Sequence, residues 1–291
     1  MIRTEERRRL AVFDTVLREI VWETEDTVTL LLDPIDHPRD YVAGQFVSID
    51  PNQFRELKQL IAYFEKVKGR RETVRAYSMA SIPSDPCIAI TVKEEEYVEG
   101  STEYPPLLSP FLVHGLEPGR KITVKGYSGY YHLPPDVEER TDHVLHLCSG
   151  SGIVPNYAML RHSLEHHPRL RHTLVYSNKT WAEVIFAEQL RAMEERYRDR
   201  FQLVNCLTRE PSIPANSVCA RLGRISREVV EPVIGDPQRT LVYACGAAIT
   251  RWDKQAARAR GEEPKPRFLE TVRAIVGELG VPRQNLHTEA Y

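Results

Sequence analysis

The sequence has few cysteines, and none of them are close together. The five in its 291 residues are Cys87, Cys148, Cys206, Cys219 and Cys245, with no Cys-x-x-Cys pair. Structural zinc and protein-bound iron–sulfur clusters need clustered thiolates, so we expect the chain to hold neither. An odd number of cysteines behind a charged N-terminus without an apolar core favours reduced thiols and a cytoplasmic location.

A strong excess of one charge and long apolar runs are also missing. The formal net charge is −2, from 39 basic and 41 acidic residues, so no overall cationic field would hold nucleic acid. No apolar run approaches the length of a membrane span. The composition, 42% hydrophobic and 27% charged, is that of a globular protein, and the length suits two domains.

The first half of the chain is typical of short β-strands. β-Branched and apolar residues cluster in four segments separated by glycine and proline, namely residues 26–32, 41–49, 87–93 and 121–125. Strands at this spacing favour a barrel or a sandwich. Residues 53–71 interrupt the pattern, because their apolar residues recur with helical periodicity and their end is basic.

After Pro134 and Pro135, strands alternate with helices. We expect buried strands at residues 143–147, 173–176, 201–205 and 240–244, and helices ending at Leu164 and spanning 181–197 and 267–279. Such alternation predicts a parallel sheet covered by helices on both faces. We therefore predict two domains, residues 1–138 and 139–291, with an antiparallel β-barrel followed by an α/β domain.

The turn after the first of these buried strands carries the pattern Ser149-Gly-Ser-Gly-Ile-Val-Pro155. Its glycines, Gly150 and Gly152, would let the backbone approach a pyrophosphate, and a helix N-terminus offers unpaired N–H groups. Pro155 suits a first helical turn, where a missing N–H costs little. The spacing is not the full Gly-x-Gly-x-x-Gly pattern, so an ordinary glycine-rich turn stays an alternative explanation.

The pattern Arg75-Ala-Tyr77-Ser78 places a permanent cation, an aromatic ring and a hydroxyl on one short strand. Arg75 and Tyr77 share a face of that strand and Ser78 lies on the other. Arginine can bind phosphate oxygens with two N–H groups, and tyrosine can stack on a planar heterocycle. On these residues alone, a strand with incidental polar side chains is the more common explanation.

Four patterns, taken in order, resemble the plant-type ferredoxin–NADP⁺ reductase family. They are Arg75-x-Tyr-Ser, Val92-Lys-x-x-x-Tyr97, Ser149-Gly-Ser-Gly-Ile-x-Pro155, and Val242-Tyr-Ala-Cys-Gly246 with a terminal Glu289-x-Tyr291. Their order and separations agree with the family over nearly the whole chain. The resemblance implies an antiparallel FAD-binding barrel followed by a Rossmann-like NAD(P)-binding domain, with the final tyrosine returning to the flavin.

For the flavin, the resemblance implies five contacts. Arg75 would hold the FAD pyrophosphate, Tyr77 would flank the isoalloxazine ring, and Ser78 would hydrogen-bond flavin N5. Tyr97 would stack on the FAD adenine, and Ser109 would touch a phosphate. The sequence departs from the family just before Ser109, where the glycine-rich stretch that cradles the FAD phosphates is replaced.

For the nicotinamide nucleotide, the resemblance implies binding by the turn and by the end of a later strand, at Gly150, Ser151, Gly152, Pro155 and Gly246. Cys245 would contact the nicotinamide ring. Glu289 would help orient the ring or relay protons, and Tyr291 would cover the flavin and move aside for the nicotinamide. With Ser78, these three residues form the predicted catalytic set. A hydride must pass between stacked rings at near-contact distance, in a site that excludes water.

The choice between NADP and NAD depends on residues 176–180, Tyr-Ser-Asn-Lys-Thr, at the end of the second strand of the predicted domain. An NAD site usually places a carboxylate there to hold the ribose 2′-OH. This chain offers Ser177 and Lys179 instead, with Arg209 as a further candidate. These residues favour the 2′-phosphate of NADP(H), with NAD as the alternative.

Two segments, residues 53–71 and 251–266, look like insertions relative to the family, and both are basic. They could form a docking face for an acidic redox protein. Solvated charged helices explain them equally well. His162 and His166 have helical i, i+4 spacing, but Glu165 does not complete a His-Glu-x-x-His motif, so we expect no metal.

These observations predict an FAD-dependent NAD(P)H oxidoreductase. It would pass a hydride between NADPH and FAD, and single electrons to or from a separate ferredoxin-like protein. One alternative is the NADH-dependent reductase component of a multicomponent oxygenase. Another is a non-catalytic flavin- or nucleotide-binding regulatory module, which would have no need of Ser78, Cys245, Glu289 and Tyr291.

Overall fold

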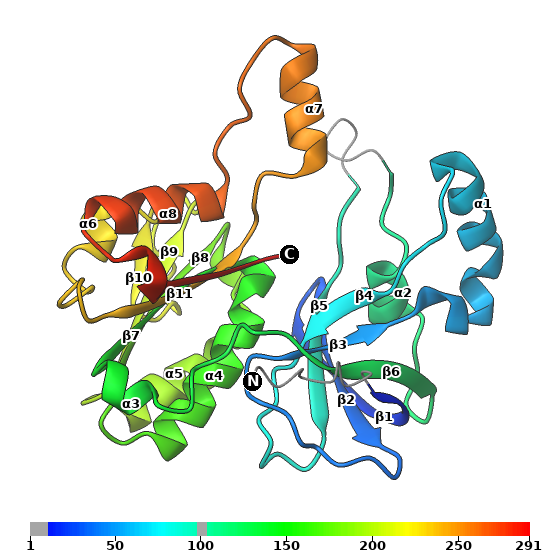
Figure 1. Ribbon diagram of the computed structural model, residues 1–291, viewed down its shortest axis with the longest axis horizontal. Coiled ribbons are helices and arrows are strands. Elements are labelled where there is room, and N and C mark those ends of the chain that lie inside the picture. Colours follow the sequence, from blue (N-terminus) through cyan, green and yellow to red (C-terminus); the bar gives the residue numbers. More distant parts are fainter. Residues whose placement is uncertain (1–10, 98–103) are drawn as a thin grey trace, which may run out of the picture.

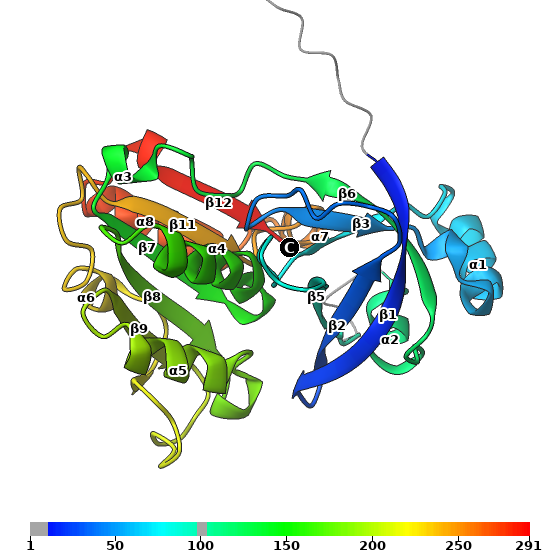
Figure 2. The same ribbon diagram turned by 90° about the horizontal axis from the view of Figure 1, so that it is seen from below.

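The computed structural model describes residues 11–97 and 104–291 (Figure 1). They form two six-stranded sheets that lie side by side, and the C-terminus lies between them (Figure 2). The first sheet is antiparallel and the second is parallel. This two-sheet arrangement confirms the predicted fold class, whereas the predicted domain limits at residues 138 and 139 stay a prediction.

The antiparallel sheet is a barrel. Its strands, in the spatial order β4-β3-β6-β1-β2-β5, are β1 (Ala11–Thr24), β2 (Thr27–Pro34), β3 (Phe46–Ile49), β4 (Arg75–Ser78), β5 (Ile88–Lys93) and β6 (Lys121–Ser128). An isolated antiparallel bridge from Met79 to Ile90 brings the two edge strands together. Leu17, Leu30 and Ile90 are among the fully buried side chains that fill the barrel.

The longest strand, β1, was not predicted. Phe13, Thr15 and Leu17 alternate inward along it, and then the register slips between Leu17 and Glu19. The predicted helix at 53–71 is shorter than expected. Two 3₁₀ turns, η1 (Pro51–Gln53) and η2 (Arg55–Leu57), precede α1 (Lys58–Lys68), which ends at a left-handed Gly69.

The parallel sheet has helices on both faces. Its strands, in the spatial order β10-β9-β8-β7-β11-β12, are β7 (His143–Ser149), β8 (Arg171–Asn178), β9 (Phe201–Leu207), β10 (Ala220–Leu222), β11 (Leu241–Gly246) and β12 (Leu286–Ala290). On one face α4 (Ile153–His166) and α5 (Ala187–Arg196) cover residues such as Leu174. On the other, α6 (Arg227–Val230) and α8 (Phe268–Glu278) cover Leu145 and Leu147 (Figure 1). This confirms the predicted parallel sheet.

The remaining elements are short: α2 (Ser109–His114), α3 (Val137–Arg140), η3 (Gly150–Gly152), η4 (Trp181–Glu183), α7 (Arg251–Ala259) and η5 (Arg283–Asn285). The helix predicted over 181–197 is broken between η4 and α5. Phe186, at this break, is buried and has a φ of 61°. Its ring stacks on the ring of Tyr157, with 4.2 Å between the ring centroids. This tertiary packing outweighs the helix propensity of the segment. In the described part of the chain, no helix is both long and apolar enough to cross a membrane.

A bidentate ion pair joins a loop of the barrel to helix α4, which covers the parallel sheet. The Arg161 guanidinium, on α4, donates two hydrogen bonds of 2.9 Å to the Asp85 carboxylate, in the loop between β4 and β5. About a quarter of each side chain is exposed (24% and 23%). Water therefore screens this pair less than a fully exposed one.

We expect Arg161→Ala to lower the thermal unfolding midpoint, with a loss on the order of 1–2 kcal/mol in the free energy of unfolding. Differential scanning calorimetry would measure it. Arg191→Ala is the matched control, because Arg191 pairs with Glu188 on the exposed surface of α5. Equal effects of the two substitutions would contradict the role of the Arg161–Asp85 pair.

Candidate functional site

The predicted glycine-rich turn packs directly against the end of strand β11. Gly150 has a φ of 49°, in the left-handed region that favours glycine. A Cβ atom on Gly152 would stand 2.2 Å from the Cys245 carbonyl oxygen, and one on Gly246 would stand 2.4 Å from Ser149 Oγ. Only glycine fits at these two contacts unless neighbouring atoms shift. The approach of this turn to a pyrophosphate stays a prediction.

The helix that follows the turn begins at Ile153. Ser151 lies within η3 and Pro155 is buried in the first turn of α4, as the sequence pattern predicts. The hydroxyl of Tyr291 donates a hydrogen bond of 3.1 Å to the Ser149 carbonyl oxygen. The Tyr291 side chain reaches back over the turn and is 61% exposed.

Strands β11 and β12 bring two of the predicted catalytic residues together. Cys245 lies opposite Glu289 on β12 and opposite Cys148 on β7. Burial raises the pKa of the Cys245 thiol well above its ordinary value. Cys245 is therefore a neutral thiol at neutral pH, suited to packing rather than to nucleophilic attack.

A hydrogen bond between the two domains joins Ser78 and Glu289. The Ser78 hydroxyl, at the end of β4, lies 3.4 Å from Glu289 Oε1. Burial raises the pKa of Glu289 to about 7, although the bond from Ser78 opposes that shift. A carboxyl group with this pKa can both accept and donate a proton near neutral pH. Of the predicted catalytic residues, Ser78, Cys245 and Glu289 therefore lie around one point.

The predicted pyrophosphate-binding cation, Arg75, is held by its neighbours. Its guanidinium donates 2.7 and 2.8 Å hydrogen bonds to the carbonyl and hydroxyl oxygens of Thr73, and one of 2.9 Å to the Glu72 carboxylate. Glu72 is almost fully buried and also pairs with Lys68 of α1. Tyr77, two residues along the strand, packs against the barrel core, and burial raises its pKa.

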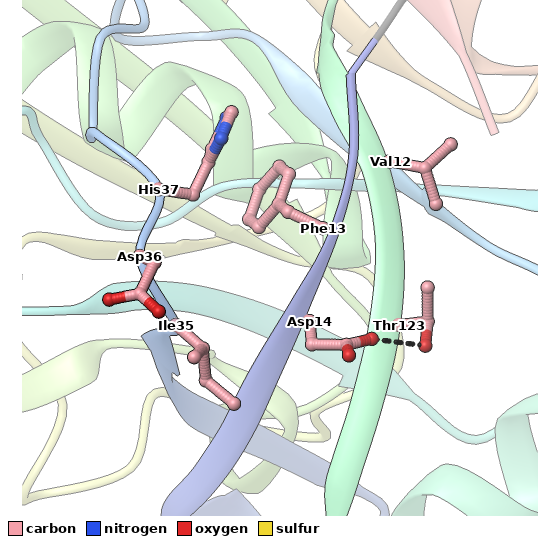
Figure 3. Close-up of a pocket in the computed structure, with 7 residues that line it drawn as sticks. All are labelled: Val12, Phe13, Asp14, Ile35, Asp36, His37 and Thr123. Atoms are coloured by element: carbon pink, nitrogen blue, oxygen red, sulfur yellow. Dashed lines mark hydrogen bonds between the residues drawn. The ribbon is translucent and has the colours of Figure 1, made fainter.

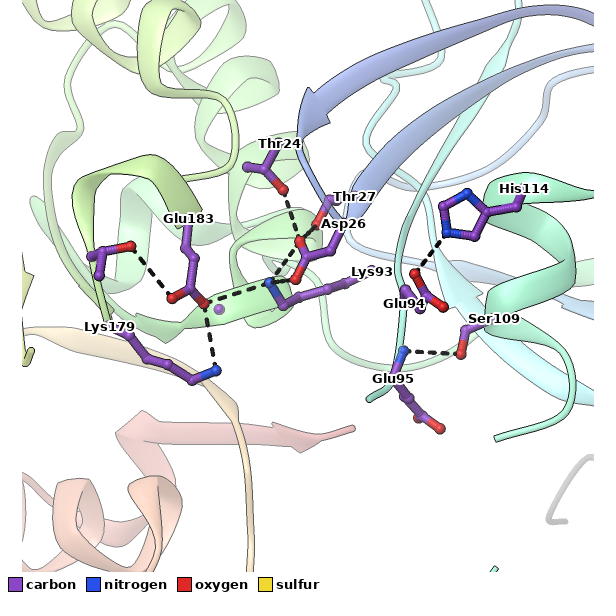
Figure 4. Close-up of polar contacts among 12 residues, drawn as sticks. Thr24, Asp26, Thr27, Lys93, Glu94, Glu95, Ser109, His114, Lys179 and Glu183 are labelled. Carbon is purple, nitrogen blue, oxygen red and sulfur yellow. Dashed lines mark hydrogen bonds and ion pairs between the residues drawn. The ribbon is translucent and has the colours of Figure 1, made fainter. Parts of the chain in front are cut away.

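Two further predicted FAD contacts, Tyr97 and Ser109, come after β5 in the chain. Tyr97 is 47% exposed. Ser109 is buried at the start of α2, where its hydroxyl accepts a 3.2 Å hydrogen bond from the Glu95 N–H (Figure 4). Of the segment that departs from the family pattern, residues 100–109, the first four residues, 100–103, lie outside the described residues.

The end of β8 carries the predicted nucleotide-selecting residues. Ser177 lies opposite Ser149, so both strand ends meet at the same edge. Lys179 Nζ is 3.7 Å from the Glu183 carboxylate, and the Lys93 ammonium of the barrel is also 3.7 Å from it (Figure 4). Arg209 lies beside this point, because its N–H donates a 2.8 Å bond to the Lys179 carbonyl.

Three partners of the predicted site residues fall outside the predicted set: Glu72, Glu183 and Ser149. Glu183 has a local signal, since it lies four residues after Lys179, the spacing of a helical ion pair. Glu72 lies three residues before Arg75 and has a similar signal. Ser149 belongs to the glycine-rich pattern at residues 149–155, whose interpretation rests on Gly150 and Gly152.

Two cavities lie away from these residues. One has a volume of about 360 Å³ and lies on the outside of the barrel. It is lined by the start of β1, at Phe13, and by the loop after β2, at His37 (Figure 3). The other, of about 430 Å³, lies at the amino end of the parallel sheet, where Arg171 and Phe201 begin β8 and β9. The candidate site does not coincide with either cavity: it lies at the opposite, carboxyl edge of the parallel sheet, where Ser78 of the barrel meets Glu289.

We expect Gly152→Ala to destabilise the fold by about 2 kcal/mol or more, because the new methyl group meets backbone atoms that cannot move aside. Gly277→Ala is the control: nothing lies within 4 Å of the added methyl in α8, and alanine favours a helix by up to about 1 kcal/mol. Thermal unfolding of both variants would test this. Equal stability of Gly152→Ala and the wild type would contradict the close contact.

The raised pKa of Glu289 predicts a particular pH dependence of stability. Between its ordinary value of 4.5 and about 7, the folded chain binds more protons at this group than the unfolded chain does. Its contribution to stability is therefore fully present below about pH 4.5 and is lost as the pH rises through about 7. Glu289→Gln should remove this dependence.

The measurement is the difference in thermal midpoint between wild type and Glu289→Gln at pH 5 and at pH 8. The wild type should lose more stability than the variant between these two pH values. Parallel pH profiles would show that the Glu289 pKa is not raised.

Comparison with known proteins finds a similarity within the region of the parallel sheet. A family model described as the oxidoreductase NAD-binding domain matches residues 147–251. The chain is 29% identical over 225 residues to a ferredoxin–NADP reductase B of Sorangium cellulosum, covering 76% of this chain and 79% of that protein.

A second relative is the ferredoxin reductase component of a 3-ketosteroid-9-alpha-monooxygenase from Mycobacterium tuberculosis. It is 26% identical over 292 residues, which are 96% of this chain but 65% of the relative. The chain thus spans less than two thirds of the length of this curated relative.

The fold has close matches among solved structures. The FAD/NAD-binding domain of a nitric oxide dioxygenase from Vibrio cholerae superposes with a TM-score of 0.69 at 19% identity, covering 96% of this chain and 98% of that one. An Amycolatopsis cytochrome P450 reductase superposes with a TM-score of 0.70 at 21% identity, and the match covers 97% of this chain and 70% of that one. At this identity the likeness concerns the fold. The sequence relatives and the matched NAD-binding domain show that the chain is similar to FAD- and NAD(P)-binding oxidoreductases of the ferredoxin reductase type.

Proposed function

We propose that the chain is an FAD-dependent NAD(P)H oxidoreductase that exchanges single electrons with a separate redox protein. The observation that carries the proposal is the meeting of Ser78, from the barrel, with Glu289 and Cys245, from the parallel sheet. A binding module would not need a hydroxyl, a carboxyl with a pKa near 7 and a buried thiol at one point between two domains.

The residues around this point fit the two cofactors of the family. On the barrel, Arg75 would hold the FAD pyrophosphate, and Tyr77 and Ser78 would contact the flavin ring. Tyr97 and Ser109 would contact the adenine and a phosphate. FAD, when bound, accepts a hydride from a reduced nicotinamide and gives up electrons one at a time.

On the parallel sheet, the turn supports nucleotide binding. In the turn formed by Gly150, Ser151 and Gly152, a Cβ atom on Gly152 would collide with β11, and α4 begins directly after the turn. A pyrophosphate there would meet the N–H groups of the turn and the positive end of the helix dipole. Gly246, at the end of β11, would leave room for the nicotinamide beside Cys245.

Glu289 and Tyr291 would control the approach to the flavin. The Glu289 carboxyl would hold or release a proton at Oε1 and would orient Ser78 by their hydrogen bond. Tyr291 contacts the turn through its hydroxyl and is largely exposed, so it could move aside without disturbing a packed core. Cys245, a neutral thiol, would line the site and help to exclude water from it.

The class of the electron acceptor follows from the cysteine content of the chain. It would be a ferredoxin-like protein or an oxygenase component, because clustered thiolates for an iron–sulfur centre are lacking in the sequence. Ser177 and Lys179 favour NADPH, whereas the pairing of Lys179 with Glu183 favours the alternative, an NADH-dependent oxygenase reductase. The five free cysteines favour a cytoplasmic location.

The test is an anaerobic titration of the FAD-loaded protein with NADPH and with NADH, followed by the loss of flavin absorbance. We expect rapid bleaching by at least one nucleotide. Ser78→Ala should keep FAD bound and lower the bleaching rate by about tenfold or more, because it removes a hydrogen bond to the reacting ring.

Ser48→Ala is the matched control. Ser48 lies on the neighbouring strand β3, opposite Ala76, and has no assigned role. Its bleaching rate should equal that of the wild type. A protein that cannot be reconstituted with FAD would contradict the proposed function, and unchanged bleaching in Ser78→Ala would contradict the role of Ser78.

A further inference from the structure

One carboxylate lies between two lysines that belong to different domains. Glu183, the last residue of η4, has its Oε2 atom 3.7 Å from Nζ of Lys179 and 3.7 Å from Nζ of Lys93 (Figure 4). Lys179 follows β8, whereas Lys93 ends β5 of the barrel. About a quarter of the Glu183 side chain is exposed, and half of the Lys179 side chain is.

The charge of Lys93 is already balanced on its own domain. Its ammonium donates hydrogen bonds of 2.6 and 2.8 Å to the two carboxylate oxygens of Asp26. Burial by itself would raise the pKa of Asp26, but the bonds from Lys93, Thr24 and Thr27 outweigh it and lower the pKa. The Asp26 carboxylate is therefore ionised at neutral pH and faces the Lys93 ammonium. The negative charge of Glu183 is then available to compensate Lys179.

Lys179 lies at the position where a dinucleotide-binding fold distinguishes NAD from NADP. Strands β7 and β8 run in register to Ser149 and Ser177, so Lys179 lies just beyond the same edge as the glycine-rich turn. In such folds a carboxylate at the end of the second strand favours the ribose 2′-OH of NAD, and a cation favours the 2′-phosphate of NADP. Here a cation and a carboxylate occupy this point together.

We propose that Glu183 is a specificity-determining residue that opposes the 2′-phosphate and makes NADH the preferred nucleotide. A phosphate that bonded to Lys179 would come close to the Glu183 carboxylate, because the same Nζ atom is 3.7 Å from it. The phosphate and the Glu183 carboxylate repel each other because both are negative, and the carboxylate partly neutralises the charge of Lys179 that would attract the phosphate. The 2′-OH of NADH carries no charge and meets no such repulsion. This inference rests on the proposed function.

The test measures binding of two half-nucleotides to the FAD-loaded protein by isothermal titration calorimetry: 2′-phospho-AMP, which carries the extra phosphate, and 5′-AMP. The wild type should bind 5′-AMP at least as tightly. Glu183→Gln should bind 2′-phospho-AMP about tenfold more tightly and 5′-AMP within about twofold of the wild type, with a gain that shrinks at high salt.

Two controls separate this role from a general effect of charge. Glu188→Gln removes the same charge from the neighbouring helix α5, where Glu188 is exposed and pairs with Arg191. It should leave the ratio of the two affinities unchanged. Lys179→Ala, added to Glu183→Gln, should abolish the gain for 2′-phospho-AMP. A gain of the same size in Glu188→Gln would overturn the proposal.

A third variant tests whether Glu183 only links the domains. Lys93→Met breaks the contact between Glu183 and the barrel but leaves Glu183 beside Lys179. It should leave binding of 2′-phospho-AMP unchanged or weaken it, because Glu183 loses a competing cation. If Lys93→Met instead reproduced the gain of Glu183→Gln, the link between domains would explain the effect and the proposal would fail.

The ratio of kcat/KM for NADPH and NADH completes the test. In Glu183→Gln this ratio should rise about tenfold through the KM for NADPH, with kcat nearly unchanged. An unchanged ratio, with the flavin still reduced by NADH, would overturn only this inference. Failure of both nucleotides to reduce the flavin in the wild type would overturn the proposed function itself.

Discussion

The close contact of two backbone segments, at Gly152 and Cys245, constrains the rest of the site. Because a methyl group at Gly152 would stand 2.2 Å from the Cys245 carbonyl oxygen, the turn after β7 can pack this closely against β11 only with glycine at that position. That position fixes the start of α4. The register of β11 with β12 then places Glu289 opposite Cys245. Backbone packing, more than attraction between side chains, determines where the chemistry-bearing groups meet.

The acid–base behaviour of the site depends on both domains at once. Glu289 has a pKa near 7 because it is buried, and its burial requires the barrel to lie against the carboxyl edge of the parallel sheet. Ser78 comes from the barrel and stabilises the ionised form through its hydrogen bond. Movement of one domain away from the other would return the carboxyl towards its ordinary pKa. The pair formed by Arg161 and Asp85 therefore supports this chemistry from a distance.

The sequence predicted the kinds of element better than their limits. It named candidate site residues but not the partners that hold them in the folded chain. The buried strands of the parallel sheet are visible as apolar runs, whereas β1 is hidden by the charges at Arg18 and Glu19, where its alternation slips. The break at Phe186 depends on stacking against Tyr157, which no local pattern encodes. Ser78 and Glu289 are 211 positions apart, so motifs could name them but not bring them to 3.4 Å.

The two cations predicted to bind phosphates show why partners matter. The role of each was predicted from its position in a motif, and each has an acidic neighbour in the folded chain: Glu72 for Arg75 and Glu183 for Lys179. The two acids differ in burial. Glu72 is almost fully buried and fixes the direction of a guanidinium that has further N–H groups to offer a phosphate. Lys179 is a single point charge 3.7 Å from a partly exposed carboxylate, so the same kind of pairing orients the arginine but competes with any phosphate at the lysine.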